Sequence, residues 1–198
     1  MIDRNRIGFL MGLLAAASVV APPAVGQAIP DALDRAAAAF VAGLAADQAR
    51  AASRPGAQQR TAERELARAT MVLERIGVHT KGSDLVLDWR RTLPASDAGP
   101  LRGRGLGPGY QQARLAPAEV YRQQQIFIGG ELARVVVAPA PRTALSLQVS
   151  DRNGQVLCRT LVETRPGECS WTPVFTSRHT FEVKAVKDAA SQFVVLTN

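Results

Sequence analysis

The sequence predicts an α+β fold in which an N-terminal helical hairpin precedes an antiparallel, jelly-roll-like β-sandwich. Residues 29–77 are rich in alanine and arginine and carry apolar residues at helical spacing. Residues 115–198 form a series of short segments in which apolar and polar residues alternate. Because no helix-length segment lies between those strands, a parallel sheet with crossover helices is excluded there.

Residues 1–28 have the three parts of a secretory signal peptide. Arg4 and Arg6 precede fifteen uncharged, largely apolar residues from Ile7 to Ala21, and small residues lie three and one positions before a cleavage site after Ala28. A retained membrane anchor is the alternative, but a spanning helix needs roughly 20 apolar residues. We therefore expect cleavage at or near Ala28, no stable membrane span afterwards, and a periplasmic or secreted location.

The helical region, 29–77, is expected to form two helices. Asp31 can cap the first, and Ser53-Arg54-Pro55-Gly56 interrupts the chain before a second helix that runs from about Gln58 to Ile76 and stops at Gly77. The expected apolar stripes are Leu33, Ala37, Phe40, Val41 and Leu44, then Ala62, Leu66, Thr70, Leu73 and Ile76. Both stripes are thin, so we expect a helical appendage that needs the sandwich or a second chain to pack on.

Residues 78–114 are predicted to be a connector rich in glycine, proline and arginine. Ser83 to Trp89 fits a short strand or a helix end. Leu101 to Tyr110 contains four glycines and one proline, which favours irregular backbone. Two Arg-Gly steps in an exported chain are too few to indicate nucleic-acid binding.

The β-sandwich domain, 115–198, is predicted to contain about seven strands. The clearest alternate Leu145, Leu147 and Val149 with polar residues and turn at Asp151-Arg152-Asn153-Gly154. Other segments lie at 123–128, 132–137, 155–161, 181–186 and 193–197. Turns at this spacing are typical of a sandwich or a jelly roll.

Cys158 and Cys169 are the only cysteines and lie eleven residues apart. In an oxidising compartment such a pair favours a structural disulfide. A redox pair would more often be spaced Cys-x-x-Cys, and a zinc site would need two further ligands, which His179 alone does not supply. We expect the disulfide, no metal site and no cofactor.

Several motifs of this region resemble the bacterial pre-peptidase C-terminal domain family. They are Phe127 to Ala133, Leu145 to Gly154, Cys158, Cys169-Ser170-Trp171-Thr172-Pro173 and the terminal Phe193 to Asn198. The resemblance covers about residues 115–198 and implies a jelly-roll-like, non-catalytic accessory module of secreted proteins, often found behind a peptidase. That peptidase is missing here, since the sequence holds no His-Glu-x-x-His and no Gly-x-Ser-x-Gly motif. Some family members bind calcium, but the neighbours of Asp151 are Arg152 and Asn153.

The residues that could carry chemistry are few, and we expect no catalytic site. His79 and His179 have no evident nucleophile or carboxylate partner and are expected at the surface or rim. Trp171 could stack on a ligand, although its place beside a cysteine favours core packing. Tyr110 and Tyr121 are the aromatic residues expected to be exposed, so the candidate ligand contacts are Tyr110, Tyr121 and Trp171.

The net charge of +7 would fall to about +6 after loss of Asp3, Arg4 and Arg6. No zone is a concentrated basic patch, so the excess suits solubility or weak attraction to anionic envelope polymers. The leading prediction is an exported, non-catalytic binding or accessory module of the cell envelope, with an envelope protein or glycan as its partner. The alternative is a structural or assembly protein that pairs through its helical hairpin, and a hydrolase with an unrecognised site is a third.

Overall fold

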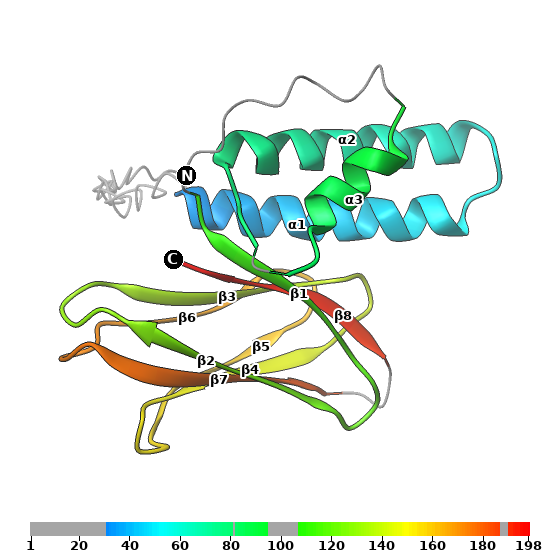
Figure 1. The fold of residues 1–198 in the computed structure, drawn as a ribbon. Helices are drawn as coiled ribbons and strands as arrows, with labels where there is room; N and C mark the ends of the chain where they lie inside the picture. The colour runs from blue at the N-terminus through cyan, green and yellow to red at the C-terminus, as the bar shows by residue number, and fades with distance from the viewer. Residues whose placement is uncertain (1–30, 81, 95–106, 187–189) are drawn as a thin grey trace, which may run out of the picture.

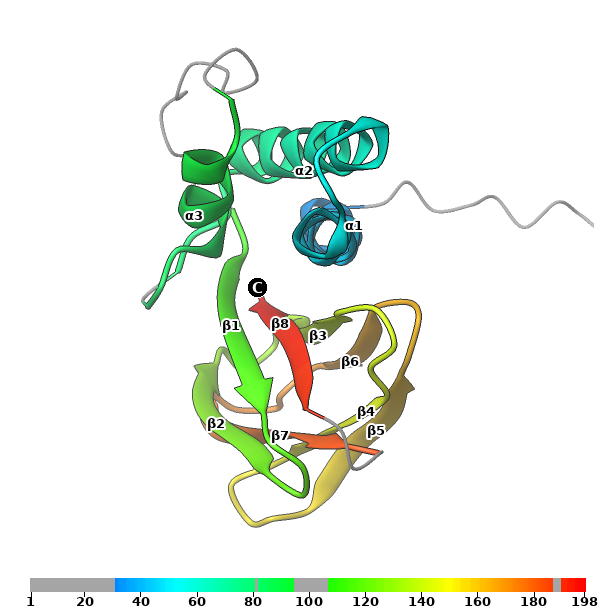
Figure 2. The ribbon, with the colours of Figure 1, turned by 90° about the vertical axis from the view of Figure 1, so that its right-hand side faces the viewer.

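A computed structural model describes residues 31–80, 82–94, 107–186 and 190–198 as three stacked layers, with helices over one β-sheet and a second sheet beneath (Figures 1 and 2). Outside these residues lies the predicted leader with its cleavage site at Ala28. The same holds for Lys81, Gly103, Gly105 and Lys187. Within the described part of the chain, no helix is long and apolar enough to cross a membrane.

The helices are α1 (Ala32–Ala52), α2 (Ala57–Ile76) and α3 (Leu85–Thr92). Helix α1 begins at the predicted cap, where the Asp34 N–H donates to the Asp31 carboxylate over 2.9 Å. Helix α2 ends at Gly77, whose left-handed φ of 78° suits glycine. Of the two structures allowed for Ser83 to Trp89, helix is the one formed, capped by the Asp84 side chain.

The helical hairpin packs on the sandwich and shares a core with it. Phe40 and Leu44 of α1 contribute to a cluster with Val136, Val194 and Leu196, which lie on the outer face of the upper sheet. Figure 2 shows α1 directly above β8 and β3, with α2 and α3 farther from the sheet. Of the two partners expected for the helical appendage, the sandwich is the one it packs on, and the hairpin forms a layer of the fold.

Eight strands form the sandwich within the described residues. They are β1 (Gly109–Leu115), β2 (Val120–Phe127), β3 (Ala133–Pro139), β4 (Leu145–Ser150), β5 (Val156–Val162), β6 (Gly167–Trp171), β7 (Ser177–Ala185) and β8 (Ser191–Thr197). The first of them lies inside the predicted connector, so the sheets begin before Leu115.

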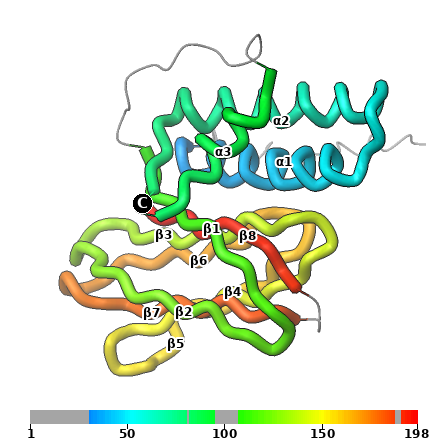
Figure 3. The backbone as a smooth tube through the Cα atoms, turned by 45° about the vertical axis from the view of Figure 1, so that its right-hand side comes forward, coloured from blue at the N-terminus to red at the C-terminus, as the bar shows by residue number. Residues whose placement is uncertain are grey.

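The strand order identifies an antiparallel jelly roll. The upper sheet runs β1-β8-β3-β6 and the lower sheet runs β2-β7-β4-β5. Strand β1 therefore pairs with β8, β2 with β7, β3 with β6 and β4 with β5, as in a long hairpin wound into two sheets. The tube in Figure 3 follows this winding from β1 round to the C-terminus, which returns beside the helices.

The two seams between the sheets differ. Cys158 of β5 is bonded to Cys169 of β6, with their Cα atoms 5.7 Å apart, which confirms the predicted disulfide and staples one seam. The other seam lies between β1 and β2, the free edges of the upper and lower sheets. No disulfide spans this second seam, because both cysteines are used in the first.

Candidate functional site: a groove at the open seam

A groove of about 1060 Å³ lies at the seam between β1 and β2. Its walls come from both edge strands, from the start of α1, from the segment around His79 and from the C-terminal residues. We use "the groove" for the space lined by Asp31, Ala32, Leu33, His79, Thr80, Gly107, Pro108, Gly109, Tyr110, Gln111, Gln123, Gln124, Gln125, Ile126, Arg178, Phe181, Val195, Thr197 and Asn198.

Glutamines occupy positions of the groove where apolar core residues would be expected. Gln123 and Gln125 alternate along β2 with exposed residues, and they pair in register with the buried Phe181 and His179 of β7. Gln111 of β1 pairs likewise with the buried Val195. The space between the sheets is therefore apolar toward its closed end and lined with amides at the open seam.

Tyr121 closes one end of this amide-lined space. Its hydroxyl lies 2.8 Å from the side-chain oxygen of Gln111 and also within hydrogen-bond distance of that of Gln123. A hydroxyl has one proton, so it donates to one amide and the other amide must donate to it. The ring packs edge-to-face on Phe193, 5.6 Å between centroids. Burial raises the pKa of the Tyr121 hydroxyl, which stays protonated. Tyr121 is half-buried and bridges the two sheets, and its contact with a ligand stays a prediction.

Tyr110 was also expected to be exposed, and that expectation is wrong. Its ring is buried against Phe40, with centroids 4.8 Å apart, and its hydroxyl donates to the Asp84 carboxylate over 2.8 Å. Burial, and then this hydrogen bond, raise the pKa of the hydroxyl above its ordinary value. Tyr110 joins β1 to the start of α3 and contributes to the groove wall as a largely buried residue.

Trp171 and His179 form an aromatic cluster near the ends of β6 and β7. Trp171 is half-buried and packs on Phe127, with centroids 4.8 Å apart, so the core-packing alternative describes it better than a stacking platform. His179 is 3% exposed and lies 5.2 Å from the Trp171 ring, so the surface position predicted for it is wrong. Its Nδ1 is 3.1 Å from the Ser177 carbonyl oxygen, a short-range contact that sequence spacing could not reveal.

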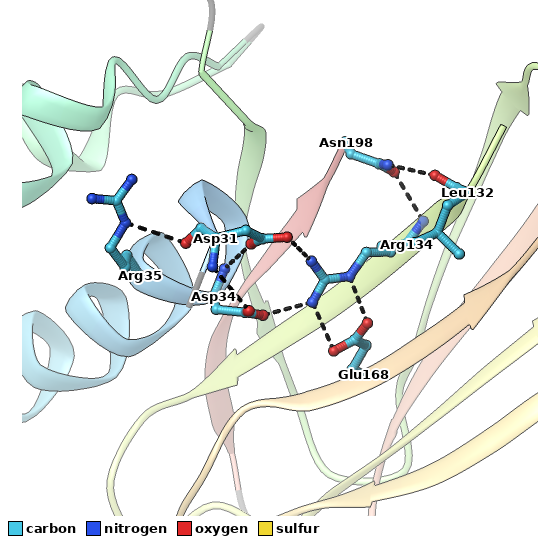
Figure 4. Close-up of polar contacts among 7 residues, drawn as sticks. All are labelled: Asp31, Asp34, Arg35, Leu132, Arg134, Glu168 and Asn198. Atoms are coloured by element: carbon cyan, nitrogen blue, oxygen red, sulfur yellow. Dashed lines mark hydrogen bonds and ion pairs between the residues drawn. The ribbon is translucent and has the colours of Figure 1, made fainter. Parts of the chain in front are cut away.

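Arg134 is the centre of an ion-pair network at one rim of the groove (Figure 4). Its guanidinium bonds to Glu168 at 2.6 Å, to Asp34 at 2.6 Å and to Asp31. Hydrogen bonding to Glu168 raises the pKa of Arg134 against partial burial, so the group keeps its charge. For Asp31, burial favours the neutral acid, but the Asp34 N–H and the Arg134 charge outweigh it and lower the pKa of the carboxyl. This network ties the start of α1 to the sheet.

The terminal residue is held at the same rim. The Asn198 amide donates to the Leu132 carbonyl over 2.6 Å and accepts from the Arg134 N–H over 2.9 Å (Figure 4). Asn198 is thus a positioned polar group at the mouth of the groove, a role that nothing in the sequence indicated.

His79 lies at the opposite rim and is exposed, as predicted. Its backbone N–H donates to the Pro108 carbonyl over 3.2 Å, and its carbonyl accepts from the Tyr110 N–H over 2.8 Å, which makes a parallel bridge to Gly109. The edge of β1 therefore already pairs with an extended segment of the chain itself at this point.

Five side-chain amides line the groove, those of Gln111, Gln123, Gln124, Gln125 and Asn198. In the described parts of the chain, no three His, Cys, Asp or Glu side chains gather closely enough to hold a metal ion. The Asp31 carboxylate is engaged by Asp34 and Arg134, so it is not available to orient an imidazole. What remains is a set of neutral amides, a rim histidine and Arg178.

No protein-family model matches the chain, and no curated protein matches it. Solved structures resemble part of it: a de novo designed double-stranded β-helix is 12% identical over 45% of this chain and 97% of its own, with a TM-score of 0.32. PliG from Aeromonas hydrophila, a periplasmic lysozyme inhibitor of g-type lysozyme, is 6% identical over 49% and 90%, with a TM-score of 0.37. The Yersinia pseudotuberculosis-derived mitogen is 8% identical over 46% and 85%, also with a TM-score of 0.37.

These likenesses concern the fold alone. None of the three structures is a pre-peptidase C-terminal domain. The resemblance to that family therefore stays a prediction.

Proposed function

We propose that the chain is an exported, non-catalytic binding module whose groove holds an extended segment of an envelope polypeptide. The observation that carries this proposal is the position of β2. It is a free sheet edge, and the groove reaches residues on both of its faces, Gln123 and Gln125 inward and Gln124 and Ile126 outward.

Strand addition explains why such an edge would bind a polypeptide. An extended peptide beside β2 can hydrogen-bond to the unpaired backbone groups of the edge, while its alternate side chains point to opposite faces. Inward side chains would meet Gln111, Gln123 and Gln125, whose amides both donate and accept. The existing bridge between His79 and Gly109 supports this mode, because the facing edge of β1 already accepts an extended segment.

A glycan is the second ligand class that the sequence suggested, and the groove suits it less well. Sugar recognition commonly uses an exposed aromatic face, whereas Tyr110, Tyr121 and Trp171 are all engaged within the protein. Phe181, the aromatic residue at the floor, is fully buried. Glycan binding is therefore the competing outcome of the binding experiment described below.

Export is part of the proposal and has two supports. The leader pattern of residues 1–28 is typical of a signal peptide, and the Cys158–Cys169 bond is a feature of oxidising compartments. The assembly alternative is less favoured, because the apolar side of the hairpin that would pair with another chain packs on the upper sheet.

The test is a selection of short random peptides on the purified chain, with immobilised envelope polysaccharides as the competing ligand class. The matched variant is Gln123→Leu/Gln125→Leu, which keeps side-chain size but removes the amides. We expect selected peptides to lose at least about tenfold in affinity for this variant. An exposed control, Gln155→Leu in the β4–β5 turn, should bind as the unchanged chain does.

The proposal would be wrong if no peptide distinguished the unchanged chain from the groove variant. It would also be wrong in its ligand class if polysaccharides alone bound and the groove variant lost that binding. Unfolding curves of both variants establish that the groove variant is folded.

A further inference from the structure

Four large apolar side chains are exposed together on two loops next to the groove. The β6–β7 loop carries Val174 and Phe175, which are 81% and 78% exposed. The β2–β3 loop carries Ile128 and Leu132, which are 56% and 57% exposed. Single exposed apolar residues are ordinary, but a group of them on neighbouring loops marks an interaction surface. We call these four residues the apolar tip.

The two loops of the tip are fixed to one another. The Gly129 N–H donates to the Thr176 hydroxyl over 3.0 Å, and the Gly130 N–H donates to the Pro173 carbonyl over 2.8 Å. A Cβ at Gly129 would lie 2.7 Å from the backbone of the β6–β7 loop, so only glycine permits this approach. The apolar side chains are thus presented by a preorganised support, which lowers the entropic cost of binding.

The apolar tip adjoins the groove at the end formed by Ile126 and Arg178. Ile126 lines the groove and pairs in register with Arg178, and Phe127 after it pairs with Ser177, so β2 and β7 deliver their loops side by side. Ile128 is the first residue after β2 and lies two positions beyond Ile126. On the other rim, the groove residue Asn198 bonds to the backbone of Leu132.

The charges around the tip favour a polypeptide over a bilayer. Insertion into anionic lipid would need basic residues around the apolar ones. Here Glu131 lies within the β2–β3 loop, and the nearby Arg134 is outnumbered by its three carboxylate partners. Arg178, in register with Ile126, is the exposed basic residue beside the tip, and one such residue is fewer than the basic cluster that anionic lipid attracts.

From this continuity we infer that the apolar tip is the second half of the binding site, and that it holds a large apolar side chain of the same polypeptide just beyond the stretch lying along β2. This inference rests on the proposed function. It adds a sequence preference to it: a polar, extended stretch flanked on one side by a leucine-, isoleucine- or aromatic-type residue that docks against Phe175 and Ile128.

The experiment uses the peptides selected on the purified chain and measures their affinity for the variant Val174→Ser/Phe175→Ser. We expect a loss of about tenfold or more, and we expect a large apolar residue to recur at one position of the selected peptides. The matched control is Leu161→Ser, a 68% exposed apolar residue on β5, which should leave affinity unchanged.

The outcomes separate this inference from the proposed function. If the tip variant binds as the unchanged chain does while Gln123→Leu/Gln125→Leu does not, the inference is overturned and the function stands. If the selected peptides depend on the tip but not on the groove, both are overturned. Because Val174 and Phe175 are exposed, their replacement should not shift the thermal midpoint, and a shift would call for the single variants.

Discussion

At the scale of single residues, the inward glutamines of β2 are positions where ligand binding favours an amide and stability favours an apolar side chain. Gln125 faces the space between the sheets, where its register partner is the buried His179. An apolar side chain there would gain burial and lose the amide that a ligand could use. Such a conflict is typical of a site retained for function.

Replacing Gln125 with leucine should therefore leave the free energy of unfolding unchanged or raise it by up to about 1 kcal/mol. Affinity for a groove-bound peptide should fall about tenfold in the same variant. Urea unfolding and peptide titration measure the two effects. A loss of both stability and affinity would indicate that Gln125 is a structural residue.

Asp31 makes stability depend on pH through the rim network. Its pKa is lowered in the folded protein, so its stabilising contribution is present above its ordinary value of 3.8 and is lost as the pH falls through the lower folded value. Asp31→Asn keeps a capping acceptor and removes the charge. Because the side chain is 56% exposed, we expect a cost below about 1 kcal/mol at neutral pH.

That cost should shrink as the pH falls through the lowered folded pKa of Asp31 and vanish at an acidic pH below it, where aspartic acid and asparagine are both neutral. Urea unfolding of both proteins at the two pH values gives the comparison. An equal difference at both values would show that the substitution acts through packing or capping alone.

Residue roles were the part of the site least accessible from sequence. Tyr110 and Tyr121 flank the end of the predicted connector, which suggested exposure, yet Tyr110 is covered by α1 and Asp84 and Tyr121 by the opposite sheet. The useful signal was the run Gln123-Gln124-Gln125 inside a strand. By alternation at least one of its three members had to face inward, and the structure turns Gln123 and Gln125 that way. A polar position on the inner face was therefore predictable.

At the scale of elements, local signals predicted the helix ends, and packing decided the rest. Asp31 and Gly77 act as the predicted cap and stop. The segment from Ser83 to Trp89 was ambiguous because it is short, and the contact of Trp89 with Phe40 is a long-range one. Strand β1 was missed because glycine and proline precede it and its pairing partner, β8, is the last strand of the chain.

Gly43 allows the short helix α3 to dock on α1. A Cβ at Gly43 would lie 2.4 Å from the Trp89 ring. Gly43→Ala should therefore destabilise the protein by about 1–3 kcal/mol, although alanine favours helix more than glycine does.

The control is Gly82→Ala, where an added Cβ would meet nothing within 4 Å. Chemical unfolding of both variants should show a clear loss for the first and a change within about 0.5 kcal/mol for the second. Equal behaviour would mean that Trp89 moves aside without cost.

At the scale of the whole molecule, the sequence predicted the class of fold but not how its layers are joined. Alternation shows which residues of a strand face inward, but not which strands are neighbours. The order β1-β8-β3-β6 and the docking of α1 on its outer face depend on contacts between distant parts of the chain. The disulfide was predictable because only two cysteines are present.

The disulfide links β5 to β6 at one seam, whereas Tyr121 bridges the other seam non-covalently, through its hydrogen bond to Gln111 and its packing on Phe193. Cys158→Ser/Cys169→Ser should lower the free energy of unfolding by about 3 kcal/mol, the loop-closure contribution for cysteines 11 residues apart. Circular dichroism without denaturant should keep its native form, because β5 and β6 stay joined by a short connection. A chain that is unfolded without the bond would show that the sandwich core alone is insufficient.

A polypeptide that adds to the free edge of β2 would form hydrogen bonds with its backbone amides. Hydrogen–deuterium exchange detects such bonds. Exchange would be measured by residue on the purified chain, alone and saturated with a selected peptide. If the peptide pairs with this edge, the backbone amides of β2 (Val120–Phe127) that face it exchange more slowly in the complex. Unchanged exchange along β2, with protection elsewhere on the molecule, would contradict this pairing.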